Sequence, residues 1–178
     1  ETLRSISMKE FRRAVEAIAQ ARKIVVYSVE DSNGVAHNLL TKLTYLGLDC
    51  RSYGDSYLQS VSASNLEKGD LAVGISYSGC SRDTVDAIRL AKKAGAKTLV
   101  ITNFDNSLIT EYADILLCTS DHQFLYGNTI FSRVTQMALV DMLYAGVLNF
   151  DYERLRKKLN KNSRIVARRA YDKKEENL

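Results

Sequence analysis

The sequence predicts an α/β protein, built as a three-layer α/β/α sandwich with a mainly five-stranded parallel sheet. Short apolar runs recur along the chain, and they are nearly continuous rather than alternating, which is typical of parallel strands buried on both faces. Segments whose apolar residues follow a helical period separate these runs. The expected strands are Ile24–Tyr27, Asp49–Tyr53, Leu71–Ile75, Lys97–Thr102 and Ile115–Cys118.

The first helix is expected over Met8 to Arg22, where apolar residues recur at helical spacing. Ser7 stands before it as an N-cap, and Glu10, three residues further on, completes a capping box. Such a helix could pack on the sheet or on a partner subunit, and the sequence leaves both open.

Helical patterns also fill the later connections. Gly47 and Gly95 end two of these helices. Helices are expected from the turn at 28–34 to about Leu46, over 85–94 and near Leu108–Tyr112, and Ser56–Ser64 is expected as a short helix or loop. A long apolar helix is expected from Ile130 onward, and a basic helix after Asp151.

The composition fits one soluble domain over residues 1–178, with its core at about 22–150. No apolar run is long enough to span a bilayer and no secretory signal pattern is present, so we expect a cytoplasmic protein with no membrane partner. Cys50, Cys80 and Cys118 lie far apart without metal-type spacing, which predicts reduced thiols and neither a metal nor a cofactor. The chain begins at Glu1 rather than at a methionine, which indicates a fragment of a longer protein.

The net charge of +4 does not by itself indicate nucleic-acid binding. Most of the excess positive charge follows Asp151, on one helix at the end of the chain. Such a helix is more often a solvated face than a DNA reader, and no helix-turn-helix pattern accompanies it. We therefore do not expect these 178 residues to read DNA by themselves.

A candidate anion site follows the strand Leu71–Ile75, in residues 76–81, which we call the serine loop. Three serines and Gly79 lie between the strand and the next helix. The first turn of a helix offers unbonded N–H groups and a positive dipole end, and serine hydroxyls add donors. In the alternative interpretation, Ser81 is merely an N-cap and the other serines form a turn. Because the hydroxyl-rich turn at 28–34 falls on the same edge of the sheet, we favour an anion site there.

The serine loop, followed by Asp83 and Thr84, resembles the Ser-x-Ser-Gly phosphate loop of the sugar isomerase (SIS) domain. Residues 91–103 continue the similarity, which extends from about Leu3 to about Leu155. The fold that this resemblance implies is the SIS fold, a flavodoxin-like, doubly wound sheet.

The order of parts is most similar to the effector domain of RpiR-type bacterial transcriptional regulators. Residues 132–136, together with Asp141, resemble the Ser-Arg-x-x-Gln-x-x-x-x-Asp signature of those regulators. The resemblance implies a phosphosugar-sensing domain that assembles as a homodimer or tetramer through its long apolar helix. It also implies that DNA is bound only through an N-terminal helix-turn-helix domain outside this chain. The ligand-binding residues that it implies are Ser32, Ser76, Ser78, Gly79, Ser81 and Thr84.

The turn after the first strand departs from the family pattern. It usually reads Gly-x-Gly-x-Ser, and here Ser28 and Glu30 replace the two glycines while Ser32 keeps its hydroxyl. A carboxylate beside a phosphate repels it. Either Glu30 points away, or it accepts hydrogen bonds from sugar hydroxyls, or the ligand differs from the usual phosphosugar.

Two other functions remain open. A sugar-phosphate isomerase needs a positioned base, and the candidates are Glu30, His37, Glu111 and His122. None of them falls in a motif that matches a catalytic position, so we do not expect an enzyme. The histidines are read as a helix-surface residue and a loop residue. The second alternative is an oligomerisation module with a decayed pocket, which the missing glycines favour.

Overall fold

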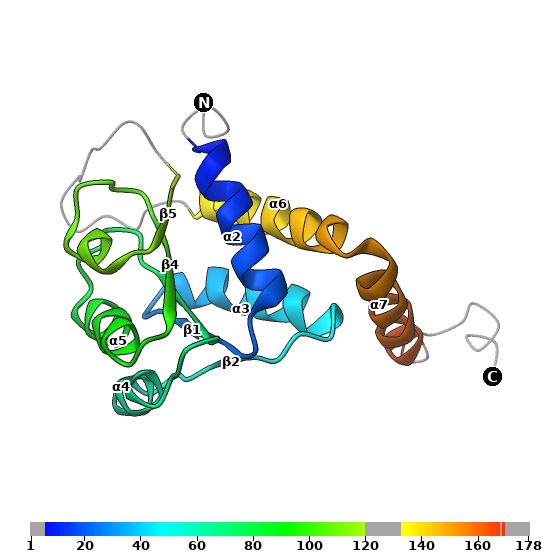
Figure 1. Cartoon of the computed structure of the whole chain (residues 1–178), viewed down its shortest axis with the longest axis horizontal. Helices are drawn as coiled ribbons and strands as arrows, with labels where there is room; N and C mark the ends of the chain where they lie inside the picture. The colour runs from blue at the N-terminus through cyan, green and yellow to red at the C-terminus, as the bar shows by residue number, and fades with distance from the viewer. Residues whose placement is uncertain (1–5, 120–132, 168, 170–178) are drawn as a thin grey trace, which may run out of the picture.

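A parallel sheet of five strands forms the centre of the computed structural model, which describes residues 6–119, 133–167 and 169 (Figure 1). The strand order is β2-β1-β3-β4-β5, and every neighbouring pair is parallel. All the expected strands are confirmed, with β2 shorter than predicted. Their bounds are β1 Ile24–Tyr27, β2 Cys50–Ser52, β3 Leu71–Ile75, β4 Lys97–Thr102 and β5 Ile115–Cys118.

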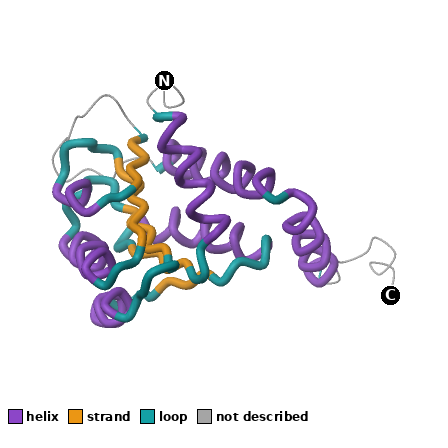
Figure 2. Tube along the Cα trace, viewed as in Figure 1, coloured by secondary structure: helices purple, strands orange, loops and turns teal. Residues whose placement is uncertain are grey.

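Helices cover both faces of the sheet and make the predicted three layers (Figure 2). Helices α2, α3 and α6 pack on one face, and α4, α5 and the 3₁₀ helix η1 pack on the other. The bounds are α2 Met8–Gln20, α3 Ser32–Tyr45, α4 Ser56–Ser64, α5 Arg82–Lys93, η1 Leu108–Tyr112, α6 Val134–Phe150 and α7 Tyr152–Ala167.

The three inner strands, β1, β3 and β4, send alternate side chains into two separate cores. In β1, Ile24 and Val26 belong to the core under α2, α3 and α6, whereas Val25 and Tyr27 belong to the core under α4 and α5. All four are at most 2% exposed. Burial on both faces explains why the sequence of this strand is continuously apolar.

Helix α2 begins where the capping box predicts, because the Ser7 hydroxyl accepts the Glu10 N–H at 3.4 Å. It packs inside the chain, against α6 and one face of the sheet. A Cβ on Gly146 of α6 would stand 2.7 Å from Cγ2 of Val15, so the small residue permits this close approach. The part of the long helix expected before residue 133 lies outside the described residues.

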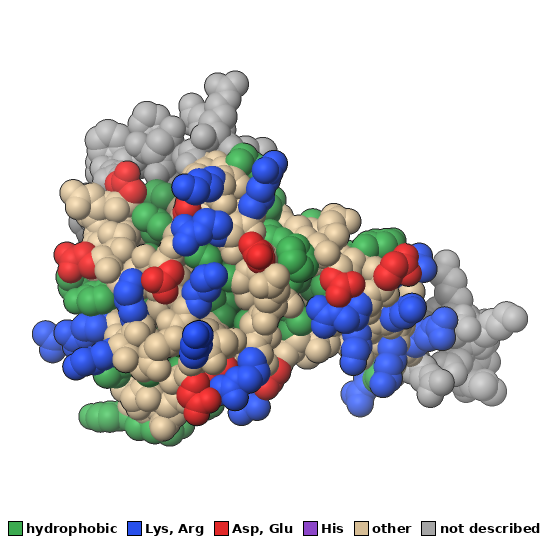
Figure 3. Space-filling view, viewed as in Figure 1, with side chains coloured by type: hydrophobic (Ala, Val, Ile, Leu, Met, Phe, Trp, Pro, Cys, Tyr) green, Lys and Arg blue, Asp and Glu red, His purple; other side chains and the backbone are tan. Residues whose placement is uncertain are grey.

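Helix α7 leaves the sheet and carries the predicted basic surface (Figure 3). Only Leu155 of this helix is buried. One side of α7 meets α3, where Asn162 donates a hydrogen bond to the carbonyl of Tyr45 at 3.0 Å. The cations Arg154, Lys157, Lys161 and Arg164 are exposed. None of the described helices is long and apolar enough to cross a lipid bilayer.

Candidate anion site at the carboxyl ends of β1 and β3

The two hydroxyl-rich turns flank one crevice at the carboxyl edge of the sheet. From β1 the chain crosses to β2 on one side, and β3 then pairs with β1 on the other side. The ends of β1 and β3 therefore form the topological switch point, where open α/β sheets bind their ligands. The turn at 28–34 and the serine loop both lie there.

The serine loop is held in shape by its own hydroxyls. Ser76 is 1% exposed, and its hydroxyl accepts the Gly79 N–H at 3.1 Å and lies 3.4 Å from the hydroxyl of Ser81. The Ser78 hydroxyl accepts the Cys80 N–H at 3.2 Å. Ser76 thus builds the loop from inside, while Ser78 and Ser81 are half-buried at its surface.

The start of α5 leaves polar groups unbonded within the described part of the chain. Ser81 occupies the N-cap position, but its side chain makes no capping hydrogen bond. The backbone N–H groups of Arg82, Asp83 and Thr84 have no partner among the described residues. The Thr84 hydroxyl is also buried there without a partner. These groups together form a nest of donors that suits an anion.

Gly79 serves packing as well as loop shape. Its φ is +67°, and a Cβ there would stand 2.6 Å from Cβ of Ser107 and 3.1 Å from Oγ1 of Thr102. Its carbonyl accepts the N–H of Ile109 at 3.0 Å. The close approach that requires a glycine is therefore between the serine loop and the segment before η1.

At the start of α3 the backbone N–H groups are already hydrogen-bonded, in contrast to those at the start of α5. The N–H groups of Ser32, Asn33 and Gly34 each donate to the carbonyl three residues earlier, at 3.2, 3.0 and 3.2 Å. Ser32 is 5% exposed. With these three N–H groups already bonded, Ser32 can offer a ligand its hydroxyl but not its own N–H.

Glu30 has a left-handed backbone conformation, which favours glycine. Its φ is +51°, and it is the one non-glycine residue with positive φ in the described part of the chain. Its side chain is exposed. At the other substituted position, the Ser28 hydroxyl donates to Oδ1 of Asn33 at 2.7 Å. The turn thus keeps its backbone shape at the cost of local strain.

Arg133 is a residue of this edge whose place sequence reasoning missed. Its guanidinium carbon lies 4.5 Å from the centre of the Tyr77 ring, in the serine loop. Its Nε lies 3.6 Å from Oδ2 of Asp31, at the start of α3. The Ser-Arg-x-x-Gln signature contained it, but nothing in the sequence places it beside either turn.

The candidate acid–base residues do not form a cluster in the described part of the chain. Glu30, His37 and Glu111 are exposed, and they lie on the turn after β1, on α3 and on η1. His122 lies outside the described residues. Among residues 6–119 and 133–167, no group of three His, Cys, Asp or Glu side chains is arranged to hold a metal ion.

A hollow of about 560 Å³ lies at the opposite, amino-terminal edge of the sheet. Its carboxylates already have cationic partners: Asp70 pairs with Arg22 and Asp114 with Lys92, at 3.0 and 3.1 Å. The unbonded donors lie at the carboxyl edge, so the chemistry and not the volume decides where the candidate site is.

A doubly wound α/β sheet with a serine-rich loop at its switch point defines the class of this protein. Residues 17–146 match the SIS domain, and the chain belongs to that family. It is 36% identical over 169 residues to an HTH-type transcriptional regulator of Caldanaerobacter subterraneus, and 30% identical over 162 residues to the HTH-type transcriptional regulator RpiR of Escherichia coli. These matches cover 94% and 90% of this chain but 60% and 55% of the relatives.

Solved structures share the fold over nearly the whole chain. The NanR protein of Vibrio vulnificus, complexed with ManNAc-6P, aligns with a TM-score of 0.89 at 26% identity, over 96% of this chain and 65% of NanR. The sugar isomerase domain of an RpiR transcription factor from Sphaerobacter thermophilus aligns with a TM-score of 0.82 at 28% identity, over 92% and 90% of the two chains. The recognition of the family from its motifs is confirmed.

Proposed function

We propose that this chain is the phosphosugar-sensing and oligomerisation domain of an RpiR-type regulator of carbohydrate metabolism. The curated relatives are HTH-type transcriptional regulators, and the chain spans 60% and 55% of the lengths of the two named above. A DNA-binding domain outside this chain accounts for the remainder. The complex of NanR with ManNAc-6P supports a sugar phosphate as the effector.

The open start of α5 is the observation that carries this proposal. The three unbonded N–H groups there and the buried hydroxyl of Thr84 supply donors to one phosphate group. Ser78 and Ser81 add hydroxyls from the serine loop. Ser76 and Gly79 keep the loop in place. The sugar then lies over the crevice between β1 and β3, within reach of Ser32.

Helix α6 is the proposed subunit interface. Its inner side is buried in the core by Leu139, Leu143 and Val147, and its outer side is also largely apolar, interrupted by Asp141, which pairs with Lys42. Val134 is 71% exposed, and Ala138 and Ala145 are exposed on the same helix. A helix with apolar residues on both its inner and outer sides is normally covered on both sides. Effector binding would shift the geometry of the dimer or tetramer, and with it the spacing of the DNA-binding domains.

The experiment is a thermal-shift screen of this chain against sugar phosphates and their unphosphorylated parents. A ligand at 100 times its dissociation constant stabilises the fold by about 2.7 kcal/mol. We expect one phosphosugar to stabilise the chain, and the Ser78→Ala variant to lose the shift. Ser163→Ala, on exposed α7, is the matched control and should keep it. Stabilisation in Glu30→Gly alone would instead indicate an oligomerisation module with a closed pocket.

A further inference from the structure

The donors of the candidate site are neutral, whereas its ligand is not. A phosphate monoester carries a charge of about −1.5 to −2 at pH 7. The serine loop and the start of α5 offer hydroxyls and N–H groups, and the neighbouring turn adds the carboxylates of Glu30 and Asp31. Backbone donors and a helix dipole supply only partial charges. A full positive charge close to the loop would strengthen the binding.

Arg133 holds such a charge across the crevice. It contacts Tyr77, which lies between Ser76 and Ser78, and it faces Asp31, which lies next to Ser32. It therefore joins the two turns that flank the switch point. Its side chain is 18% exposed, so water screens its charge less than that of a surface arginine.

We propose that Arg133 binds the phosphate of the effector and exchanges Asp31 for it. This inference rests on the proposed function of the site. The distance of 3.6 Å between Nε of Arg133 and Oδ2 of Asp31 exceeds that of a charge-assisted hydrogen bond, about 2.7–2.9 Å. Asp31 is 57% exposed, so water can solvate its carboxylate after the exchange. A guanidinium matches a phosphate with two parallel hydrogen bonds, which Asp31 does not receive from Nε at this distance.

Stacking on Tyr77 fixes the position of the Arg133 guanidinium. The Tyr77 ring itself packs edge-on against Phe104, with ring centres 6.0 Å apart. The cation is thus held beside the serine loop before a ligand arrives, which lowers the cost of ordering it.

The exchange of Asp31 for phosphate also affects α6, the helix of the proposed subunit interface. Arg133 is the N-cap residue of α6. When its side chain moves from Asp31 to the phosphate, the first turn of α6 is no longer linked to the start of α3 but to the bound ligand. The residue thereby couples the effector to the helix whose outer side we assign to the subunit contact.

The test measures binding of inorganic phosphate, ManNAc-6P and a panel of other sugar 6-phosphates to four variants of this chain by calorimetry and thermal shift. We expect Arg133→Gln to weaken phosphate binding by at least about tenfold, as is typical when a hydrogen bond to a charged group is lost. Arg133→Lys should keep part of the affinity, because lysine keeps the positive charge but cannot donate the two parallel hydrogen bonds of a guanidinium. Asp31→Asn should bind severalfold tighter, because the competing carboxylate is gone. Arg89→Gln, an exposed arginine about two turns further along α5 that pairs with Asp86, is the control and should bind as the parent does.

The opposite signs expected for Arg133→Gln and Asp31→Asn keep the test decisive, since a poorly folded variant cannot bind more tightly. Equal affinity in Arg133→Gln and the parent, or the same loss in Arg89→Gln, would overturn the assignment of Arg133 while leaving the proposed function standing. A parent chain that binds neither inorganic phosphate nor any of the sugar phosphates would overturn both.

Discussion

Gly79 and Ser107 lie so close together that a Cβ on Gly79 would stand 2.6 Å from the Cβ of Ser107. The serine loop is therefore packed directly on the segment that leads into η1. Since loop shape and packing depend on the same residue, the candidate site is tied to the core of the second layer, in which Ile109 is fully buried.

Gly79→Ala should destabilise the chain by about 2–5 kcal/mol. Left-handed backbone costs a non-glycine residue about 1–2 kcal/mol, and the overlap with Ser107 adds a cost of about 1–3 kcal/mol. Gly69→Ala is the matched control, because Gly69 also has a positive φ, +95°, but no atom lies within 4 Å of its added Cβ. Urea unfolding of both variants measures the difference. Equal losses would show that the contact with Ser107 contributes nothing.

Glu30→Gly should stabilise the fold by about 0.5–1 kcal/mol. Relief of the left-handed backbone, worth about 1–2 kcal/mol, exceeds the extra entropy of a glycine in the unfolded chain, about 0.4–1 kcal/mol. Glu30→Gln separates strain from charge: it should leave the stability unchanged. Both variants should bind phosphate more tightly than the parent if the carboxylate faces the pocket. Thermal unfolding and calorimetry together distinguish these effects.

The sequence was sufficient for the elements that depend on local pattern. Buried strands such as Ile24–Tyr27 and capped helices such as α2 carry their signal in neighbouring residues, so their positions could be predicted. The serine loop could be located for the same reason, because a strand, a hydroxyl-rich turn and a helix follow one another directly.

The remaining features of the site depend on backbone geometry and on distant residues. Nothing in the composition of the two turns shows that the N–H groups are bonded at the start of α3 and unbonded at the start of α5. Arg133 lies about a hundred residues after Asp31 in the chain, and only the packing of α6 on α3 brings the two together. The left-handed backbone of Glu30 is likewise set by the turn that surrounds it.

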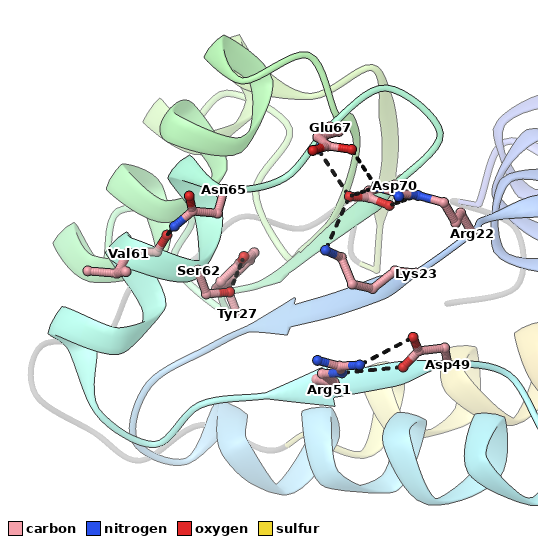
Figure 4. A network of polar contacts seen from close by, with 10 residues as sticks. All are labelled: Arg22, Lys23, Tyr27, Asp49, Arg51, Val61, Ser62, Asn65, Glu67 and Asp70. Carbon is pink, nitrogen blue, oxygen red and sulfur yellow. Dashed lines mark hydrogen bonds and ion pairs between the residues drawn. The ribbon is translucent and has the colours of Figure 1, made fainter.

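Asp70 should make stability depend on pH in the acid range. Its side chain is fully buried between the starts of β1 and β3 and pairs with Arg22 and Lys23 at 3.0 and 3.4 Å (Figure 4). Burial alone would raise its pKa, but the hydrogen bonds from Arg22 and from the backbone N–H of Glu67, with the charge of Lys23, hold the pKa below its ordinary value. A lowered pKa stabilises the fold above the unfolded value of about 3.9, and this stabilisation is lost as the pH falls through the folded value.

Asp70→Asn should therefore destabilise the chain by about 1–3 kcal/mol at pH 7, and by less as the pH falls below about 4. Asp49→Asn is the control on the same edge, because Asp49 pairs with Arg51 in an exposed ion pair that contributes little to stability. Urea unfolding at a series of pH values measures both. A constant difference between the Asp70→Asn variant and the parent from pH 7 to pH 3 would contradict the lowered pKa.

A charge on the outer side of α6 should separate the subunits and leave each one folded. Ala138 is exposed there, between Val134 and Asp141 on the helix surface. In Ala138→Glu a carboxylate would lie at the proposed contact, where burying an unpaired charge is costly. Ser163→Glu, on exposed α7, is the control for added charge. Light scattering during size-exclusion chromatography should find the mass of a single chain for Ala138→Glu and an oligomer for Ser163→Glu and the parent, with unchanged circular dichroism. If Ala138→Glu keeps the mass of the parent oligomer, the interface lies elsewhere, and the link from Arg133 through α6 to the assembly fails with it.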